Sequence, residues 1–305
     1  MRCMKLSAKA VSAGFLAAVL LVAGCSTDSL DDDASAAPAA GSSSAAESAA
    51  GGGYGGDGAD AIAAIPRLNI EVVAEHPFDD GAFTQGLEVD DDGSLLIGTG
   101  QYGESAIWRV RDWRAGSPAE DRRDLPREFF GEGITRAGDR VWQLTWKKGV
   151  AFARDAVTLE ETGRAEYSGE GWGLCDQGDR LMMSDGSHTL TFRDPETFEE
   201  TGSVDVVVGD VLVDQLNELE CVDGPDGPEV WANRWMTNDI VRIDPDTGEV
   251  TGFADATGLV ESLSPEARDR ADVFNGIAHV PGTDHFLVTG KYWPTLFEVR
   301  FTPAE

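Results

Sequence analysis

A three-part motif recurs five times along this sequence, and it constrains the fold more than any other feature. Each copy opens with a turn, usually containing glycine, that leads into an apolar residue. A short apolar run follows about ten residues later, and a second short run follows the first. The opening parts are Phe83–Leu87, Phe130–Ile134, Glu170–Leu174, Leu216–Glu220 and Phe274–Ala278. A period of roughly 40–50 residues that carries several short strands is typical of a β-propeller, so the sequence predicts an all-β fold with five blades.

The two ends of the repeat region predict how the ring closes. Clusters of Gly, Asp and Pro separate the predicted strands and favour hairpin turns. The fifth copy stops at its third strand, near Phe301, whereas Leu68–Ala74 alternates like a strand and precedes the first copy. Pairing of the chain ends would remove an exposed sheet edge. We therefore expect this N-terminal strand to complete the last blade. We also expect a short helical insertion near 255–273, where Ser264 is a candidate N-cap.

The N-terminal region predicts export. Three basic residues precede the apolar stretch Val11–Ala23, which is too short for a mature membrane anchor and has the form of a signal peptide. Small residues stand directly before Cys25, as in a bacterial lipobox; a signal peptide with an incidental cysteine is the alternative. Residues 25–66 are rich in Ala, Gly and Ser and cannot form a core. We expect a lipoprotein signal peptide (1–24), a disordered tether (25–66) and a propeller domain (67–305). A lipid on Cys25 would anchor the exported protein to the outer face of the bacterial cytoplasmic membrane, or the protein would be periplasmic.

The charge, the cysteines and the histidines limit the kinds of partner and cofactor that we expect. The formal net charge of −31 argues against binding of nucleic acid or anionic membrane by the protein surface. Membrane contact is expected only through the lipid. Cys175 and Cys221 follow the opening motifs of neighbouring repeats and would be able to pair in an oxidising compartment, but spacing alone leaves this open. The four histidines lack the spacing of zinc ligands, and no metal or cofactor is expected. A closed ring has no edge that demands a partner, so a monomer is expected.

Residues at equivalent places in the repeats are expected to converge on one face. In a propeller the first strand of each blade lines the central channel, so the ends of these strands meet. The opening motifs supply Phe83, Gln85, Glu132, Trp172, Asn217 and Asn275, and the ends of the second runs supply Trp146, Trp235 and Lys291, with Trp293 two residues further on. This set predicts a small aromatic-walled pocket with a few polar groups. Packing between blades is the alternative for each tryptophan. Glu132, between two glycines, is harder to explain by packing.

Several motifs, in order and with consistent spacing, resemble the plant-type glutaminyl-peptide cyclotransferases from about Leu68 to Phe301. They are Phe83–Leu87, Gly131-Glu-Gly133, Trp142–Trp146, Gly171-Trp-Gly173, Leu216–Glu220, Val230–Trp235, Asn275–Ala278 and Val288–Pro294. The resemblance implies a five-bladed propeller that converts the N-terminal glutamine of a peptide to pyroglutamate and releases ammonia. It makes Glu132 the acid/base and Gln85, Trp146, Trp172, Asn217, Trp235 and Lys291 the other pocket residues.

The chemistry of cyclisation suggests the roles of these groups. Glu132 would take a proton from the attacking amine and return it to the leaving ammonia. Lys291 or the Asn217 amide would stabilise charge on the γ-carbonyl oxygen, and Phe83, Asn275 and Trp293 would complete the substrate pocket. Two other functions stay open. One is a calcium-dependent propeller lactonase with Glu132, Asn217 and Asn275 as oxygen ligands. The other is a propeller lipoprotein that binds a peptide or sugar without turnover.

Overall fold

The computed structural model describes residues 65–304, and almost all of their regular structure is β. Three separate sheets each contain four strands that follow one another in chain order. The first sheet contains β2 (Thr84–Val89), β3 (Leu95–Thr99), β4 (Ala106–Val110) and β5 (Glu120–Asp124). The second contains β6 (Gly131–Ala137), β7 (Arg140–Thr145), β8 (Val150–Asp155) and β9 (Glu161–Glu166). The third contains β10 (Leu174–Asp176), β11 (Leu181–Met183), β12 (Thr189–Arg193) and β13 (Glu200–Asp205).

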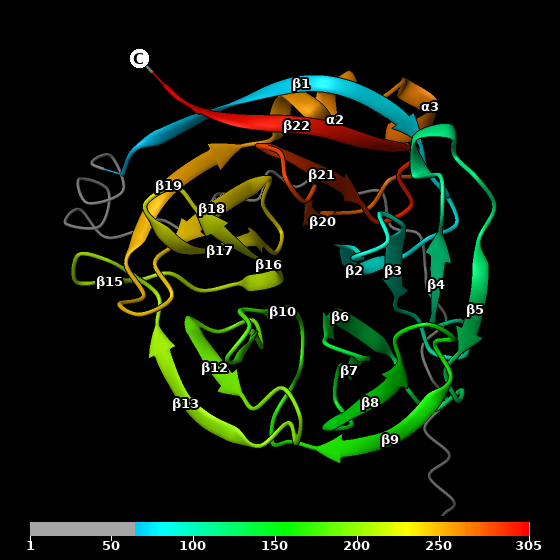
Figure 1. The fold of residues 1–305 in the computed structure, drawn as a ribbon. Helices are drawn as coiled ribbons and strands as arrows, with labels where there is room; N and C mark the ends of the chain where they lie inside the picture. The colour runs from blue at the N-terminus through cyan, green and yellow to red at the C-terminus, as the bar shows by residue number, and fades with distance from the viewer. Residues whose placement is uncertain (1–64, 305) are drawn as a thin grey trace, which may run out of the picture. The chain divides into compact units, whose positions relative to one another are not determined.

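The remaining large sheet has eight strands and unites both ends of the described chain. Its order is β16-β17-β18-β19-β1-β22-β21-β20. One half contains β16 (Leu216–Gly224), β17 (Gly227–Arg234), β18 (Asp239–Ile243) and β19 (Val250–Asp255). The other half contains β20 (Phe274–His279), β21 (His285–Gly290), β22 (Thr295–Pro303) and β1 (Arg67–Pro77). Figure 1 shows these groups of strands around a common centre, with β5, β9, β13 and β1 on the outside.

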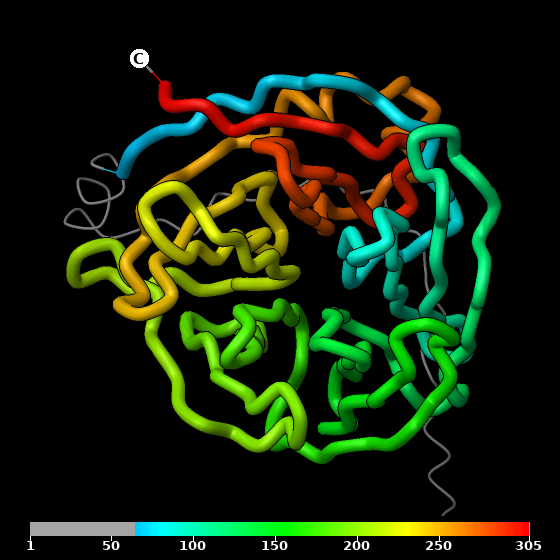
Figure 2. The backbone as a smooth tube through the Cα atoms, viewed as in Figure 1, coloured from blue at the N-terminus to red at the C-terminus, as the bar shows by residue number. Residues whose placement is uncertain are grey.

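The first described strand pairs with the last one. Strand β1 is antiparallel to β22 from Leu68↔Pro303 to Pro77↔Thr295, and it also meets β19 in parallel through two residue pairs. Figure 2 shows the blue and red ends of the described chain running side by side. The predicted pairing of the N-terminal strand with the end of the fifth repeat is therefore observed.

Few helical turns interrupt the strands. Helices α2 (Thr257–Ser262) and α3 (Pro265–Arg268) form the expected insertion, and Ser264 caps α3 because its Oγ accepts a hydrogen bond from the Ala267 N–H at 3.1 Å. A 3-10 turn, η1, spans Trp113–Ala115, and a small hairpin joins β14 (Val207–Val208) to β15 (Val211–Leu212). No helix within residues 65–304 is long and apolar enough to cross a membrane.

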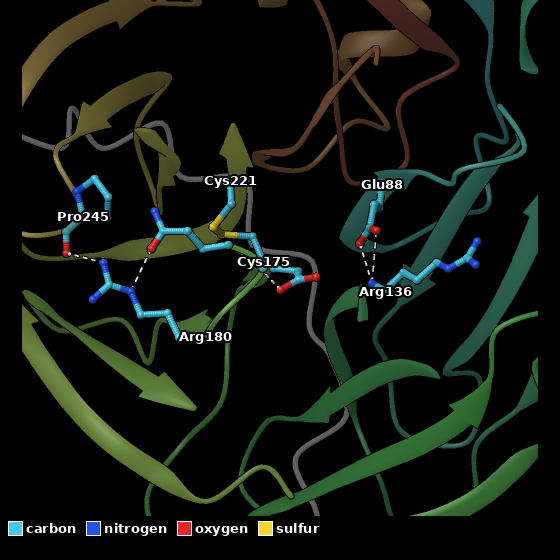
Figure 3. Close-up of a disulfide and its surroundings, with 9 residues drawn as sticks. Glu88, Arg136, Cys175, Arg180, Cys221 and Pro245 are labelled. Carbon is cyan, nitrogen blue, oxygen red and sulfur yellow. Dashed lines mark hydrogen bonds between the residues drawn. A yellow bond between two sulfur atoms is a disulfide. The ribbon is translucent and has the colours of Figure 1, made fainter. Parts of the chain in front are cut away.

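The core lies between neighbouring sheets, where buried side chains of one pack against those of the next. In one cluster Leu95 and Trp108 from the first sheet join Leu287 and Leu296 from the eight-stranded sheet. A covalent link adds to this packing between β10 and β16. Cys175 and Cys221 form a disulfide with their Cα atoms 5.4 Å apart, which settles the pairing that the sequence left open (Figure 3).

Close approach between the innermost strands explains their glycines. A Cβ on Gly173 would lie 2.0 Å from the carbonyl oxygen of Asn217 in β16. A Cβ on Gly133 would lie 2.7 Å from the carbonyl oxygen of Trp172, which accepts a 2.7 Å hydrogen bond from the Gly133 N–H. A buried carboxylate joins three inner strands, because Glu218 accepts from Leu87 N and Ile277 N. The inner strands therefore present their ends at fixed positions.

Candidate active site

A cavity of about 180 Å³ is formed where the inner strands begin and the second strands end. All five groups of four strands contribute, because their inner strands begin close together. The lining residues are Phe83, Gln85, Phe130, Glu132, Trp146, Trp172, Asn217, Trp235 and Lys291. Eight of these nine were expected from the sequence, and Phe130 is the addition. Five of the lining residues are aromatic, and one carboxylate and one ammonium group stand among their rings.

Glu132 contributes the carboxylate of the cavity. Its side chain is 4% exposed, and its carboxylate has no hydrogen-bond partner among residues 65–304. Burial raises the pKa of Glu132 well above 4.5; the ammonium of Lys291 opposes that rise, and the carboxylate of Glu170 adds to it. Gly131 and Gly133 let this strand approach its neighbours closely, since a side chain at either position would collide with a neighbouring strand. This close approach sets the position of Glu132 between them. An unbonded carboxylate with a raised pKa is suited to proton transfer.

Lys291 contributes the cation of the cavity. Its side chain is also 4% exposed, and its Nζ lies 4.5 Å from the centre of the Phe83 ring. Burial lowers the pKa of Lys291, while the carboxylates of Glu132 and Asp272 oppose that change. The end of the helical insertion holds the backbone of this residue, because Asp272 N donates to Lys291 O and Lys291 N donates to Val273 O. The insertion therefore supports the position of the lysine.

Indole rings form the wall of the cavity, and a carboxylate outside it fixes two of them. Trp172 and Trp235 meet edge to face with ring centres 5.5 Å apart, and Trp235 is 38% exposed at the mouth. Glu170 Oε2 accepts hydrogen bonds from the Nε1 atoms of Trp146 at 2.6 Å and Trp172 at 3.0 Å. Lys147 approaches Glu170 Oε1 to 3.5 Å and lies over the Trp146 ring. The sequence analysis missed this role of Glu170, although the residue opens the third repeat.

Two amides supply the remaining polar atoms. Asn217 is 3% exposed, and its Oδ1 is buried without a hydrogen-bond partner among the described residues. A buried acceptor without a partner costs free energy, and a ligand N–H group that donates to Asn217 Oδ1 would remove this cost. Gln85 is held from behind, since Asn275 Nδ2 donates to its Oε1 at 3.3 Å and to the Thr84 carbonyl at 3.2 Å.

Two expected substrate-binding residues do not line the cavity. Asn275 is fully buried behind Gln85. Trp293 is 1% exposed and packs against Phe274, and its Nε1 donates to the Asp272 carbonyl. Trp293 was expected in the pocket because it stands two residues beyond Lys291, but β21 ends at Gly290 and Tyr292 then adopts a φ of 61°. The chain therefore turns Trp293 into the core.

The ligand set of the lactonase alternative is only partly assembled. Glu132 and Asn217 line the cavity, whereas Asn275 does not. Among residues 65–304, no group of three or more His, Cys, Asp or Glu side chains is arranged to hold a metal ion.

The fold and the cavity define an all-β protein with a small aromatic pocket in which a carboxylate and an ammonium group are buried. A sequence model of the glutamine cyclotransferase family matches residues 36–301, and the chain belongs to this family. It is 36% identical over 253 residues to a glutaminyl-peptide cyclotransferase of Arabidopsis thaliana, covering 82% of this chain and 77% of that protein. The crystal structure of Myxococcus xanthus glutaminyl cyclase matches with a TM-score of 0.70 and 34% identity, over 79% of this chain and all of that one.

Proposed function

We propose that this protein is a glutaminyl-peptide cyclotransferase that converts the N-terminal glutamine of peptides to pyroglutamate. The α-amine nitrogen forms a bond to the γ-carbonyl carbon, the bond from that carbon to the amide nitrogen breaks, and ammonia leaves. One observation carries the proposal: in a chain of this family, the unbonded carboxylate of Glu132 and the ammonium of Lys291 line the same aromatic pocket.

The pocket favours the bent form of the substrate that the reaction needs. Closing a five-membered ring is fast once the α-amine lies against the γ-carbonyl, so holding that conformer supplies much of the catalysis. A cavity of about 180 Å³ with indole walls leaves little space for an extended glutamine side chain. The fixed indoles of Trp146 and Trp172 therefore act in positioning.

Glu132 is the proposed general acid/base. In its ionised form it accepts a proton from the α-amine as the nitrogen attacks, and it then donates that proton to the departing amide nitrogen. Positioned proton transfer of this kind typically contributes about 10²–10⁴-fold in rate. The raised pKa of Glu132 supports the first step because a carboxylate with a raised pKa is a stronger proton acceptor.

Lys291 and Asn217 are proposed to complete the reaction centre. Negative charge develops on the γ-carbonyl oxygen as the α-amine attacks, and the buried Lys291 ammonium stabilises it. The sequence analysis gave the Asn217 amide the same role. The unpartnered Asn217 Oδ1 adds a second possibility, which is to accept an N–H of the substrate and orient the glutamine.

We also propose the finer architecture and the location of the protein. The three separate sheets and the two halves of the eight-stranded sheet correspond to five propeller blades, with β1 as the outer strand of the last. Residues 1–64 lie outside the described part of the chain, and a lipid on Cys25 remains our proposal from the sequence. The Cys175–Cys221 disulfide supports an oxidising, extracytoplasmic compartment. Loss of membrane association in Cys25→Ala would support the anchor, and unchanged association would contradict it.

Incubation of the purified protein with a Gln-initiated peptide tests the function. We expect equal amounts of pyroglutamyl peptide and ammonia, at rates well above those of the peptide alone and unchanged by a chelator. A peptide that binds and returns unchanged would indicate a binding protein. Lactone hydrolysis that EDTA abolishes and Ca²⁺ restores, without ammonia release, would indicate the lactonase.

A further inference from the structure

The reaction pocket is too small to hold a peptide. Its volume of about 180 Å³ lies below the roughly 300–1,000 Å³ of pockets that enclose drug-sized ligands. A single glutamine residue fills such a space. The chain that follows this residue must therefore leave through the mouth and cross the surface beside it.

A second cavity begins at the wall of the first. Its volume is about 540 Å³, and Phe83 lines both cavities. The loop Gln101–Glu104 between β3 and β4 forms one side, and the residues around Arg122 and Arg127 form another. Charged side chains line this cavity, among them Glu104, Arg122 and Arg127, whereas aromatic rings dominate the reaction pocket. A larger and more polar groove of this kind suits an extended peptide with polar main-chain groups.

Tyr292 stands where the two cavities meet. It lines the second cavity and directly follows Lys291, which lines the first. Its ring meets the Phe83 ring edge to face at 5.3 Å, and its N–H donates to the Ala82 carbonyl at 2.8 Å. Its φ of 61° is uncommon for a residue with a side chain, and such conformations cluster at functional sites. The backbone thus holds this ring against Phe83, the residue that the two cavities share.

The two arginines of the second cavity differ in their partners. Arg122 binds Asp124 at 2.9 Å and lies over the Trp108 ring. Arg127 is exposed and forms no ion pair within residues 65–304. Its guanidinium is therefore available to a carboxylate or carbonyl oxygen of a ligand. Glu104 on the opposite loop supplies an acceptor for main-chain N–H groups.

We propose that the second cavity binds the two or three residues that follow the N-terminal glutamine of the substrate. The first of these residues crosses Phe83 and Tyr292, and the later ones reach Arg127. This inference rests on the proposed cyclotransferase function. If the groove binds these residues, the enzyme should prefer peptides to derivatives of a single glutamine, such as glutamine amide.

The test compares two substrates, glutamine amide and the tripeptide Gln-Phe-Ala. We expect the wild-type protein to have a higher kcat/KM for the tripeptide. Contacts with a remote part of the substrate increase kcat/KM, so removing them lowers the ratio of tripeptide to amide. Tyr292→Gly removes the ring at a position where glycine tolerates the backbone, and we expect this ratio to fall by about tenfold. Arg127→Ala should lower it by about threefold.

Controls separate this proposal from the function on which it rests. Tyr292→Phe keeps the ring and should keep the ratio, and melting temperatures report whether each variant is folded. Equal kcat/KM of the wild type for both substrates would overturn the groove while leaving the cyclotransferase function intact. So would losses in Tyr292→Gly and Arg127→Ala that are the same for both substrates. No turnover of either substrate by the wild type would overturn both proposals.

Discussion

The carboxylate of Glu170 accepts a hydrogen bond from the indole N–H of Trp146 at 2.6 Å. The same oxygen also binds the indole N–H of Trp172, which comes from the next group of strands. A single side chain outside the cavity therefore sets the angle between two of its walls. Hydrogen bonds to a charged acceptor are worth about 1.5–3 kcal/mol each, enough to hold the rings in place.

Removing Glu170 should loosen both indoles without removing a catalytic group. We expect Glu170→Ala to lower kcat/KM about tenfold and to change the tryptophan fluorescence spectrum. Glu170→Gln keeps an acceptor oxygen and should recover part of the loss. Glu166→Ala, an exposed carboxylate at the end of β9, is the matched control. Equal effects of Glu170→Ala and Glu166→Ala would show that Glu170 has no positioning role.

The acid limb of the pH–rate profile should report Glu132. The group must be ionised to accept the amine proton, and its pKa is raised well above 4.5, so kcat/KM should fall on acidification with a midpoint well above pH 4.5. The negative charge of Glu170 raises the pKa of Glu132, so Glu170→Gln should move that midpoint to lower pH. A midpoint that stays fixed or moves upward in this variant would contradict the assignment.

The basic limb should report Lys291. Burial lowers the pKa of this lysine below 10.5, so its charge and the rate should be lost at a lower pH than for an exposed lysine. Lys291→Arg keeps the charge throughout, because the guanidinium pKa exceeds about 12. This variant should lack the basic limb, whatever its absolute rate. If wild type and Lys291→Arg share one basic limb, another group causes it.

The disulfide should contribute to stability rather than to turnover. Cys175 and Cys221 are 46 residues apart in sequence, and a loop of this length predicts a stabilisation of about 3–4 kcal/mol. We expect Cys175→Ala/Cys221→Ala to lower the free energy of urea unfolding by this order, with kcat/KM nearly unchanged. Reductant should destabilise the wild type and have no effect on the double variant. If reductant also destabilised the double variant, the loss of stability in the wild type could not be attributed to the Cys175–Cys221 disulfide.

Sequence reasoning succeeded where a residue type had only one physical explanation. Glu132 stands between glycines because Gly131 and Gly133 lie where a Cβ would collide with neighbouring strands. The repeat phase likewise predicted that Gln85, Asn217 and Lys291 meet, because the starts of the inner strands and the ends of the second strands recur together in every group. The strand before the first repeat was also correctly paired with β22.

The remaining features depend on contacts that no spacing encodes. Trp293 was misplaced because the left-handed backbone of Tyr292 is not visible in the residue type. The two hydrogen bonds of Glu170 depend on indoles that belong to different groups of strands. The disulfide depends on the distance between β10 and β16. Each of these contacts is tertiary, so it can be predicted only once the arrangement of the sheets is known.

The most direct measurement is the rate of ammonia release from a Gln-initiated peptide by Glu132→Gln beside the wild type. Glutamine has nearly the shape of the protonated carboxyl group, so the variant should keep its melting temperature. It cannot exchange the proton, and we expect kcat to fall by at least about a hundredfold. Wild-type turnover together with near-normal turnover in the folded variant would contradict the central claim that Glu132 transfers the proton.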